Sequence, residues 1–130
     1  MCTGPSGMDE LPMKFPSLED QMGDDLSLWR WFTEVIRVRR AFPAIARGTT
    51  EAVDGVCDEA VAAFIRRCDG EQDVLVVMNL RGVPAEKDLS GIAENLELAA
   101  VLNTDEMPIS FEAGILILPA YSIAILTPEA

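Results

Sequence analysis

The stretch "AVAAFIRRCDGEQDVLVVMNL", residues 60–80, decides the fold class. Apolar, β-prone segments stand at its two ends, and the first has the period of two that is typical of a strand. The Asp-Gly pair at 69–70 between them is a hairpin turn signal. Residues 74–78 are apolar on both faces, which suits a strand in the middle of a two-layer sandwich. We therefore predict an antiparallel hairpin inside a β-sandwich.

Further strand-like segments lie on both sides of this hairpin. Gly, Pro and Asn residues separate them at a spacing of roughly ten residues, which is typical of antiparallel sandwiches. The segments are 96–103, 114–119 and 121–128, together with a weaker one around 49–56. The predicted fold class is mainly β, and one antiparallel sandwich domain is expected over residues 46–130.

A helix is predicted over 25–42, ahead of the sandwich. Asp24 and Asp25 suit its N-terminus, arginines gather in its last turns, and Pro43 ends it. The helix is apolar on more than one side. One stripe consists of Leu28, Trp31, Phe32, Val35, Val38 and Phe42, and a second of Trp29 and Ile36. Because a surface helix usually needs only one stripe, two stripes predict a helix that packs between two bodies.

Residues 1–24 differ from the rest of the sequence. They hold three of the eight prolines and three of the nine glycines, and they show no sustained period. This composition predicts an extended loop. Because a self-contained domain seldom starts with so long a loop, we expect a connection whose upstream anchor is missing.

Size and charge limit the possible partners. A chain of 130 residues suits one domain of ordinary size. Its net charge of −12, from 22 acidic and 10 basic residues, repels polyanions, so nucleic acids and anionic membrane surfaces are not expected as partners. The sequence has no apolar run long enough to span a bilayer, and its N-terminus lacks the pattern of a signal peptide.

Candidate catalytic residues are few. The chain has no histidine, and Cys2, Cys57 and Cys68 lack a CxxC spacing, so we expect free thiols rather than a zinc site. Carboxylates cluster at 19–25 and 57–60, as the acid and the nucleophile of a glycosidase would, but an acidic surface produces such clusters as well. We predict no catalytic residue, no metal site and no cofactor in this chain.

Three motifs follow one another along the chain. The helix ends in the pattern I-x-x-R-x-x-x-P-A-I-x-x-G, the strand after it reads "VLVVMNL" over 74–80 with Asn79 in place, and the C-terminal part contains L-P-A-x-S-x-x-I-L. In this order they resemble the C-terminal part of glycoside hydrolase family 13, the α-amylase family. The residues that carry the first and third motifs are Ile36, Arg39, Pro43, Ala44, Ile45, Gly48, Leu118, Pro119, Ala120, Ser122, Ile125 and Leu126.

The resemblance implies a place for each segment in a larger enzyme. Residues 1–24 would be the loop after the last strand of a (β/α)8 barrel, 25–42 the last barrel helix, and 46–130 the Greek-key-like sandwich that is called domain C. The two helix stripes would then contact the barrel of the same parent chain and domain C. The side chains expected at these contacts are Leu28, Trp29, Trp31, Phe32, Val35, Ile36 and Phe42. Without the barrel, the exposed helix would favour self-association.

The resemblance also implies a function. The parent enzyme would be a retaining α-glycosidase that acts on α-glucosidic bonds of starch-like glucans or oligosaccharides. The family's catalytic carboxylates lie on earlier barrel strands, so this chain alone is expected to be inactive, with a structural or accessory role. The alternative is a free-standing β-sandwich module that binds carbohydrate or protein, with the helix as an appendage.

Overall fold

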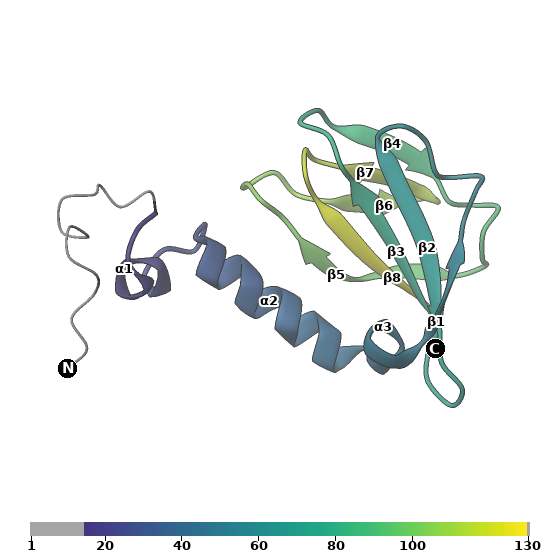
Figure 1. Ribbon diagram of the computed structural model, residues 1–130. Coiled ribbons are helices and arrows are strands. Elements are labelled where there is room, and N and C mark those ends of the chain that lie inside the picture. The colour runs from purple at the N-terminus through teal and green to yellow at the C-terminus, as the bar shows by residue number, and fades with distance from the viewer. Residues whose placement is uncertain (1–14, 130) are drawn as a thin grey trace.

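The hairpin over residues 60–80 lies at the centre of a five-stranded antiparallel sheet (Figure 1). The computed structural model describes residues 15–129. In spatial order the five strands are β1 (Thr49–Ala52), β2 (Val61–Arg67), β3 (Val74–Asn79), β8 (Ile123–Pro128) and β5 (Leu96–Leu102). A second antiparallel sheet consists of β4 (Ala85–Asp88), β7 (Ile115–Leu118) and β6 (Ser110–Glu112). The fold is the mainly β, antiparallel sandwich that the sequence predicts.

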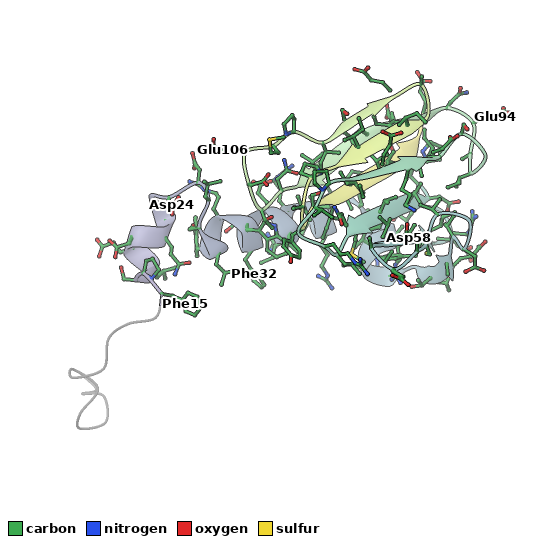
Figure 2. The ribbon with its side chains drawn as sticks, turned by 90° about the horizontal axis from the view of Figure 1, so that it is seen from above. Phe15, Asp24, Phe32, Asp58, Glu94 and Glu106 are labelled. Carbon is green, nitrogen blue, oxygen red and sulfur yellow. The ribbon has the colours of Figure 1, made fainter. Side chains whose placement is uncertain are left out.

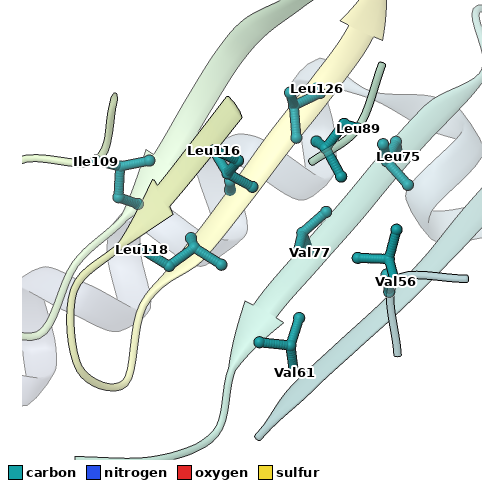
Figure 3. Close-up of a cluster of buried hydrophobic side chains, with 11 residues drawn as sticks. Val56, Val61, Leu75, Val77, Leu89, Ile109, Leu116, Leu118 and Leu126 are labelled. Atoms are coloured by element: carbon teal, nitrogen blue, oxygen red, sulfur yellow. The ribbon is translucent and has the colours of Figure 1, made fainter. Parts of the chain in front are cut away.

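Strand β3 is buried on both faces, as its continuous apolar run predicts. Leu75 and Val77 belong to the core between the two sheets, together with Leu116 of β7 (Figure 3). Val74 and Val76 point to the opposite face of the sheet and belong to a second buried cluster, under the long helix. The structure therefore has three layers: a helix, the five-stranded sheet and the three-stranded sheet.

The β2–β3 hairpin has the register that its sequence suggests. Val61 lies opposite Asn79 at one end of the ladder, and Arg66 lies opposite Val74 at the other. In the connecting turn Gly70 has a φ of 79°, which is the left-handed conformation that glycine adopts without strain. The Asp-Gly signal is thus confirmed as a turn.

Two short strands were not predicted from the sequence. β4 reads AEKD and β6 reads SFE, so neither has a run of apolar or β-branched residues. They pair with the two edges of β7, and β7 contributes most of the apolar residues of this sheet. Local propensity says little about such edge strands, because their pairing with a distant segment decides their conformation.

The helical region differs from the prediction at both ends. α2 (Leu28–Ala41) begins three residues later than predicted, because Ser27 is the N-cap and its Oγ accepts a hydrogen bond from Arg30 N–H at 3.2 Å. Pro43 ends α2 as predicted, but it also starts a further helix, α3 (Pro43–Arg47), in which it occupies the first turn. The boundary of the sandwich domain at residue 46 therefore falls inside α3.

The predicted loop over 1–24 is wrong for residues 18–22, which form the short helix α1 (Leu18–Met22). Ser17 is the N-cap, and its Oγ accepts the N–H of Asp20 at 3.2 Å. The sequence Ser-x-x-Asp at 17–20 is a capping signal that would have found this helix. Residues 1–14 of the predicted loop lie outside the described part of the chain.

The two sheets are also joined by an ion pair. Asp58, in the β1–β2 loop, binds Lys87 of β4. The hydrogen bond from Lys87, with those from Ala60 N–H and Val61 N–H, lowers the pKa of Asp58 from 3.8 to about 2. Because the folded carboxyl ionises more easily than an unfolded one, its stabilising contribution is present above the ordinary pKa and is lost as the pH falls through the folded value.

Asp58→Asn should therefore destabilise the protein in a pH-dependent way. Urea unfolding should show the largest difference between the variant and the native chain at about pH 6, and a clearly smaller difference at about pH 2.5, where the pH is close to the folded pKa of Asp58 and much of its charge-dependent contribution is lost. Asp69→Asn, in the exposed β2–β3 turn, is the matched control and should change little at either pH. An equal loss for Asp58→Asn at both pH values would show that its charge is irrelevant.

Candidate functional site

Helix α2 carries its apolar side chains on one broad arc. At about 100° per residue, the side chains from Val38 round to Trp29 span an arc of roughly 180°. The five-stranded sheet covers only part of this arc. Val38 is buried, and Val35 and Phe42 are half-buried, all against the cluster that contains Val76 of β3. We refer to this part of the helix as the inner face.

The rest of the arc is exposed. Leu28, Phe32 and Ile36 follow one another at four-residue spacing and are 67%, 58% and 37% exposed. Phe15 lies beside Leu28, since the two line the same hollow. Figure 2 shows Phe15 and Phe32 on one side of α2, whereas Glu106 in the β5–β6 loop lies on the other side. We refer to Phe15, Leu28, Phe32 and Ile36 as the outer apolar face.

The two stripes differ in membership from the sequence prediction. Leu28 and Phe32 were grouped with the inner residues Val35 and Phe42, but in the structure they are exposed together with Ile36. The reason is geometrical: the N-terminal end of α2 extends past the sheets (Figure 1), and Leu28 and Phe32 lie on the side of the helix that no strand covers. The sequence shows the width of the arc, but not the place where the sheet divides it.

The two tryptophans are half-buried and lie near the two ends of the arc, Trp31 at the end of Val38 and Trp29 at the end of Ile36. The guanidinium of Arg30 lies over the Trp29 ring, 5.5 Å from its centroid, in a cation–π arrangement. Trp31 lines a small cavity with Leu102 and Asn103 at the end of β5. Neither ring forms a flat exposed platform of the kind that a sugar-binding surface needs.

The clustered carboxylates have local structural partners. Asp20 accepts a hydrogen bond from Ser17 Oγ at 2.7 Å, Asp24 accepts the N–H of Leu26 at 2.9 Å, and Asp58 binds Lys87 and two backbone N–H groups. These three carboxylates therefore serve in a cap, a turn and an ion pair, and Asp25 and Glu59 of the same clusters pair with Arg30 and Arg81. Among residues 15–129 we identify no pair of carboxylates as a general acid and a nucleophile.

The cysteines and the other potential metal ligands among residues 15–129 do not form a metal site either. Cys57 and Cys68 are free thiols, and Cys57 Sγ exchanges hydrogen bonds with the backbone of Ala63 at 3.3 Å; Cys2 lies outside the described residues. Over residues 15–129, no group of three or more His, Cys, Asp or Glu side chains could hold a metal ion. No helix in the same range has the length and apolar character needed to cross a bilayer.

Comparison with known proteins rests on structure. No family model matches the sequence, and no curated protein matches it significantly. Among solved structures, Eubacterium rectale Amy13B matches the whole chain with a TM-score of 0.90 and 30% identity, over 25% of its own length. The α-glucosyl transfer enzyme XgtA matches 87% of the chain with a TM-score of 0.72 and 26% identity, over 20% of its length.

A third solved structure shares the fold at lower identity. An α-amylase from H. orenii matches 87% of the chain with a TM-score of 0.70 and 24% identity, over 22% of its own length. The chain thus spans a quarter or less of the length of each of these three proteins. In each case the larger part of the solved protein has no counterpart in this chain.

Proposed function

The chain has the structure of the C-terminal part of an enzyme of glycoside hydrolase family 13, the α-amylase family, and from this premise we propose that it is the structural accessory domain of such an enzyme. In this proposal α2 is the last helix of a (β/α)8 barrel, and the sandwich is domain C. The barrel carries the catalytic groups and this chain carries none. The parent enzyme cleaves or transfers α-glucosidic bonds with retention, on starch-like glucans or oligosaccharides.

The observation that carries the proposal is the outer apolar face. Monomeric proteins seldom leave several large apolar side chains contiguous and uncovered on a helix. Leu28, Phe32 and Ile36 form such a stripe, on the side of α2 that the sandwich does not cover. A barrel wall packed there would bury them. At about 1.5–3 kcal/mol for each fully buried side chain, the contact would stabilise the two parts by several kcal/mol.

The size of the native gene product tests the proposal most directly. Antibody raised against this chain should detect, in the source cells, a band much larger than its own 14.2 kDa. The same fraction should degrade or transglycosylate maltooligosaccharide. A band at the size of this chain alone would remove the barrel from the proposal and would favour the free-standing binding module.

Phe32→Ser tests the face itself, in two settings. In the isolated 130-residue chain, Phe32 is 58% exposed, so its replacement should change the free energy of unfolding by less than about 0.5 kcal/mol. In the full-length gene product the same change should cost roughly 2 kcal/mol or more, because a buried ring is lost. Thermal and urea unfolding of both chains provide the comparison.

A matched control separates docking from general surface effects. Ile117 of β7 is 44% exposed and lies in the three-stranded sheet, away from α2. Ile117→Ser should therefore have the same small effect in both chains. If Phe32→Ser also had equal effects in the short and the long chain, the outer apolar face would not be a docking surface. In the isolated chain, Phe32→Ser should in addition reduce any self-association measured by sedimentation.

A further inference from the structure

A groove separates the inner face of α2 from the five-stranded sheet. Its volume is about 410 Å³, within the range of small-molecule sites. Val35 and Val38 of α2 form one wall, and Val76 of β3 and Ile125 of β8 belong to the opposite wall. Its polar lining residues are Arg39, Thr50 and Arg66, and none of the lining residues is acidic, although the chain has 22 Asp and Glu residues. We refer to this space as the α2 groove.

Most basic residues of the described part of the chain are paired with a carboxylate, but those that line the α2 groove are not. Of ten basic residues, Lys14 lies outside the described part, which leaves nine. Six of these nine form an ion pair with a carboxylate: Arg30, Arg37, Arg47, Arg67, Arg81 and Lys87. Over residues 15–129 the three basic residues without a carboxylate partner are Arg39, Arg40 and Arg66. Two of them, Arg39 and Arg66, line the α2 groove.

The two groove arginines are held differently. Arg66 donates from Nε to Ala44 O at 3.2 Å, from a terminal nitrogen to Ile45 O at 3.0 Å, and from the other to Thr50 Oγ1. All three acceptors are neutral, so the bonds fix the guanidinium but leave its charge uncompensated. Arg39 is exposed, and its side chain has no hydrogen bond or ion pair with any described residue. Its side chain can therefore turn toward an anion at the mouth of the groove.

We propose that the α2 groove binds a small amphipathic carboxylate. The carboxylate is paired with the Arg39 guanidinium, which can bind both of its oxygens, and Arg66 adds to the positive potential at the rim. The aliphatic tail lies between Val35 and Ile125, where it replaces empty space with dispersion contacts and is removed from water. In a chain of net charge −12, an anion is attracted only where the local charge is positive, and the groove is such a place.

The proposal does not depend on the accessory role. The groove lies under the inner face of α2, whereas the outer apolar face is on the exposed part of the arc. An amphiphile bound at the outer face would contact Phe32, which does not line the groove. The two surfaces can therefore be tested separately in the same chain.

Decanoate is the probe, titrated into the 130-residue chain below its micelle-forming concentration. Calorimetry should show saturable binding of one decanoate for each chain. Decanol, which has the same tail and no charge, should bind more weakly by a factor of about ten or more. Arg39→Gln should weaken decanoate binding by about tenfold, because a charge-assisted hydrogen bond is lost.

Two control variants make each outcome decisive. Arg40→Gln removes an equally unpaired charge from the adjacent residue, which does not line the groove, and should leave the affinity unchanged. Phe32→Ser should leave it unchanged as well. The proposal is overturned by the absence of saturable binding, by equal losses in Arg39→Gln and Arg40→Gln, by equal binding of decanol and decanoate, or by loss of binding in Phe32→Ser.

Discussion

Gly48→Ala is expected to lower the free energy of unfolding by roughly 3 kcal/mol, a large effect for one methyl group. Gly48 joins α3 to β1, with φ −75° and ψ 166°, a conformation that any residue adopts. The reason is therefore steric rather than conformational. An added Cβ would lie 2.5 Å from Ala44 O and 2.6 Å from Arg67 O, far inside contact distance.

Neither carbonyl can move alone. Ala44 O accepts hydrogen bonds from Gly48 N–H at 2.9 Å and from Arg66 Nε at 3.2 Å, and Arg67 O belongs to the edge where β2 pairs with β1. Relief of the clash would have to shift α3 away from the sheet. Because α3 follows α2 directly, the shift would also widen the α2 groove.

Urea unfolding of both proteins measures the effect. Gly55→Ala is the matched control, since nothing lies within 4 Å of the position of its added Cβ. It should change the free energy of unfolding by less than about 0.5 kcal/mol in either direction. A similar small change for Gly48→Ala would mean that the joint between helix and sandwich is loosely held.

The sequence predicts the parts of the fold that local signals determine. The hairpin of β2 and β3 has an Asp-Gly turn and strong β propensity, and β3 has apolar residues on both faces, so its central position follows from the run alone. Short strands such as β4 depend on long-range pairing instead. For this reason they cannot be predicted from the local sequence of each segment alone.

The candidate surfaces, too, can be predicted only in part from the sequence. The broad apolar arc of α2 is visible in the sequence, and so is the inference that two bodies cover it. Which residues face the sheet depends on where α2 crosses it, and Leu28 and Phe32 were therefore grouped wrongly. The α2 groove could not be predicted at all, because Arg39 on the helix and Arg66 on β2 come together only in the tertiary structure.

Asn79→Ala is the second substitution with a large expected effect, again roughly 3 kcal/mol of unfolding free energy. The side chain is 2% exposed, at the end of β3. Its Nδ2 donates to Val83 O at 2.8 Å, to Pro119 O at 2.9 Å and, at 3.4 Å, to Leu118 O. Its Oδ1 accepts the N–H of Arg81 at 3.1 Å.

These bonds join two loops that are distant in the sequence, after β3 and after β7. An alanine removes the bonds to the buried carbonyls of Leu118 and Pro119, of which Pro119 O keeps only the bond from Ser122 Oγ at 2.7 Å, and a buried polar group that loses its partner costs about 1–3 kcal/mol. The loss exceeds that expected for a deleted surface amide, because the side chain of Asn79 and its bonds to Leu118 O and Pro119 O are buried. Both loops should become more mobile together, which hydrogen exchange at Arg81 and Ser122 N–H would report.

Asn103→Ala is the matched control for the amide. Asn103 Nδ2 also donates to a loop carbonyl, Met107 O at 2.8 Å, but this carbonyl belongs to an exposed residue to which water has access. The control should cost about 1 kcal/mol or less. Equal costs for the two substitutions would show that the amide at Asn79 contributes no more than an ordinary loop hydrogen bond. A several-fold larger cost at Asn79 would identify it as the bond that holds the end of the sandwich together.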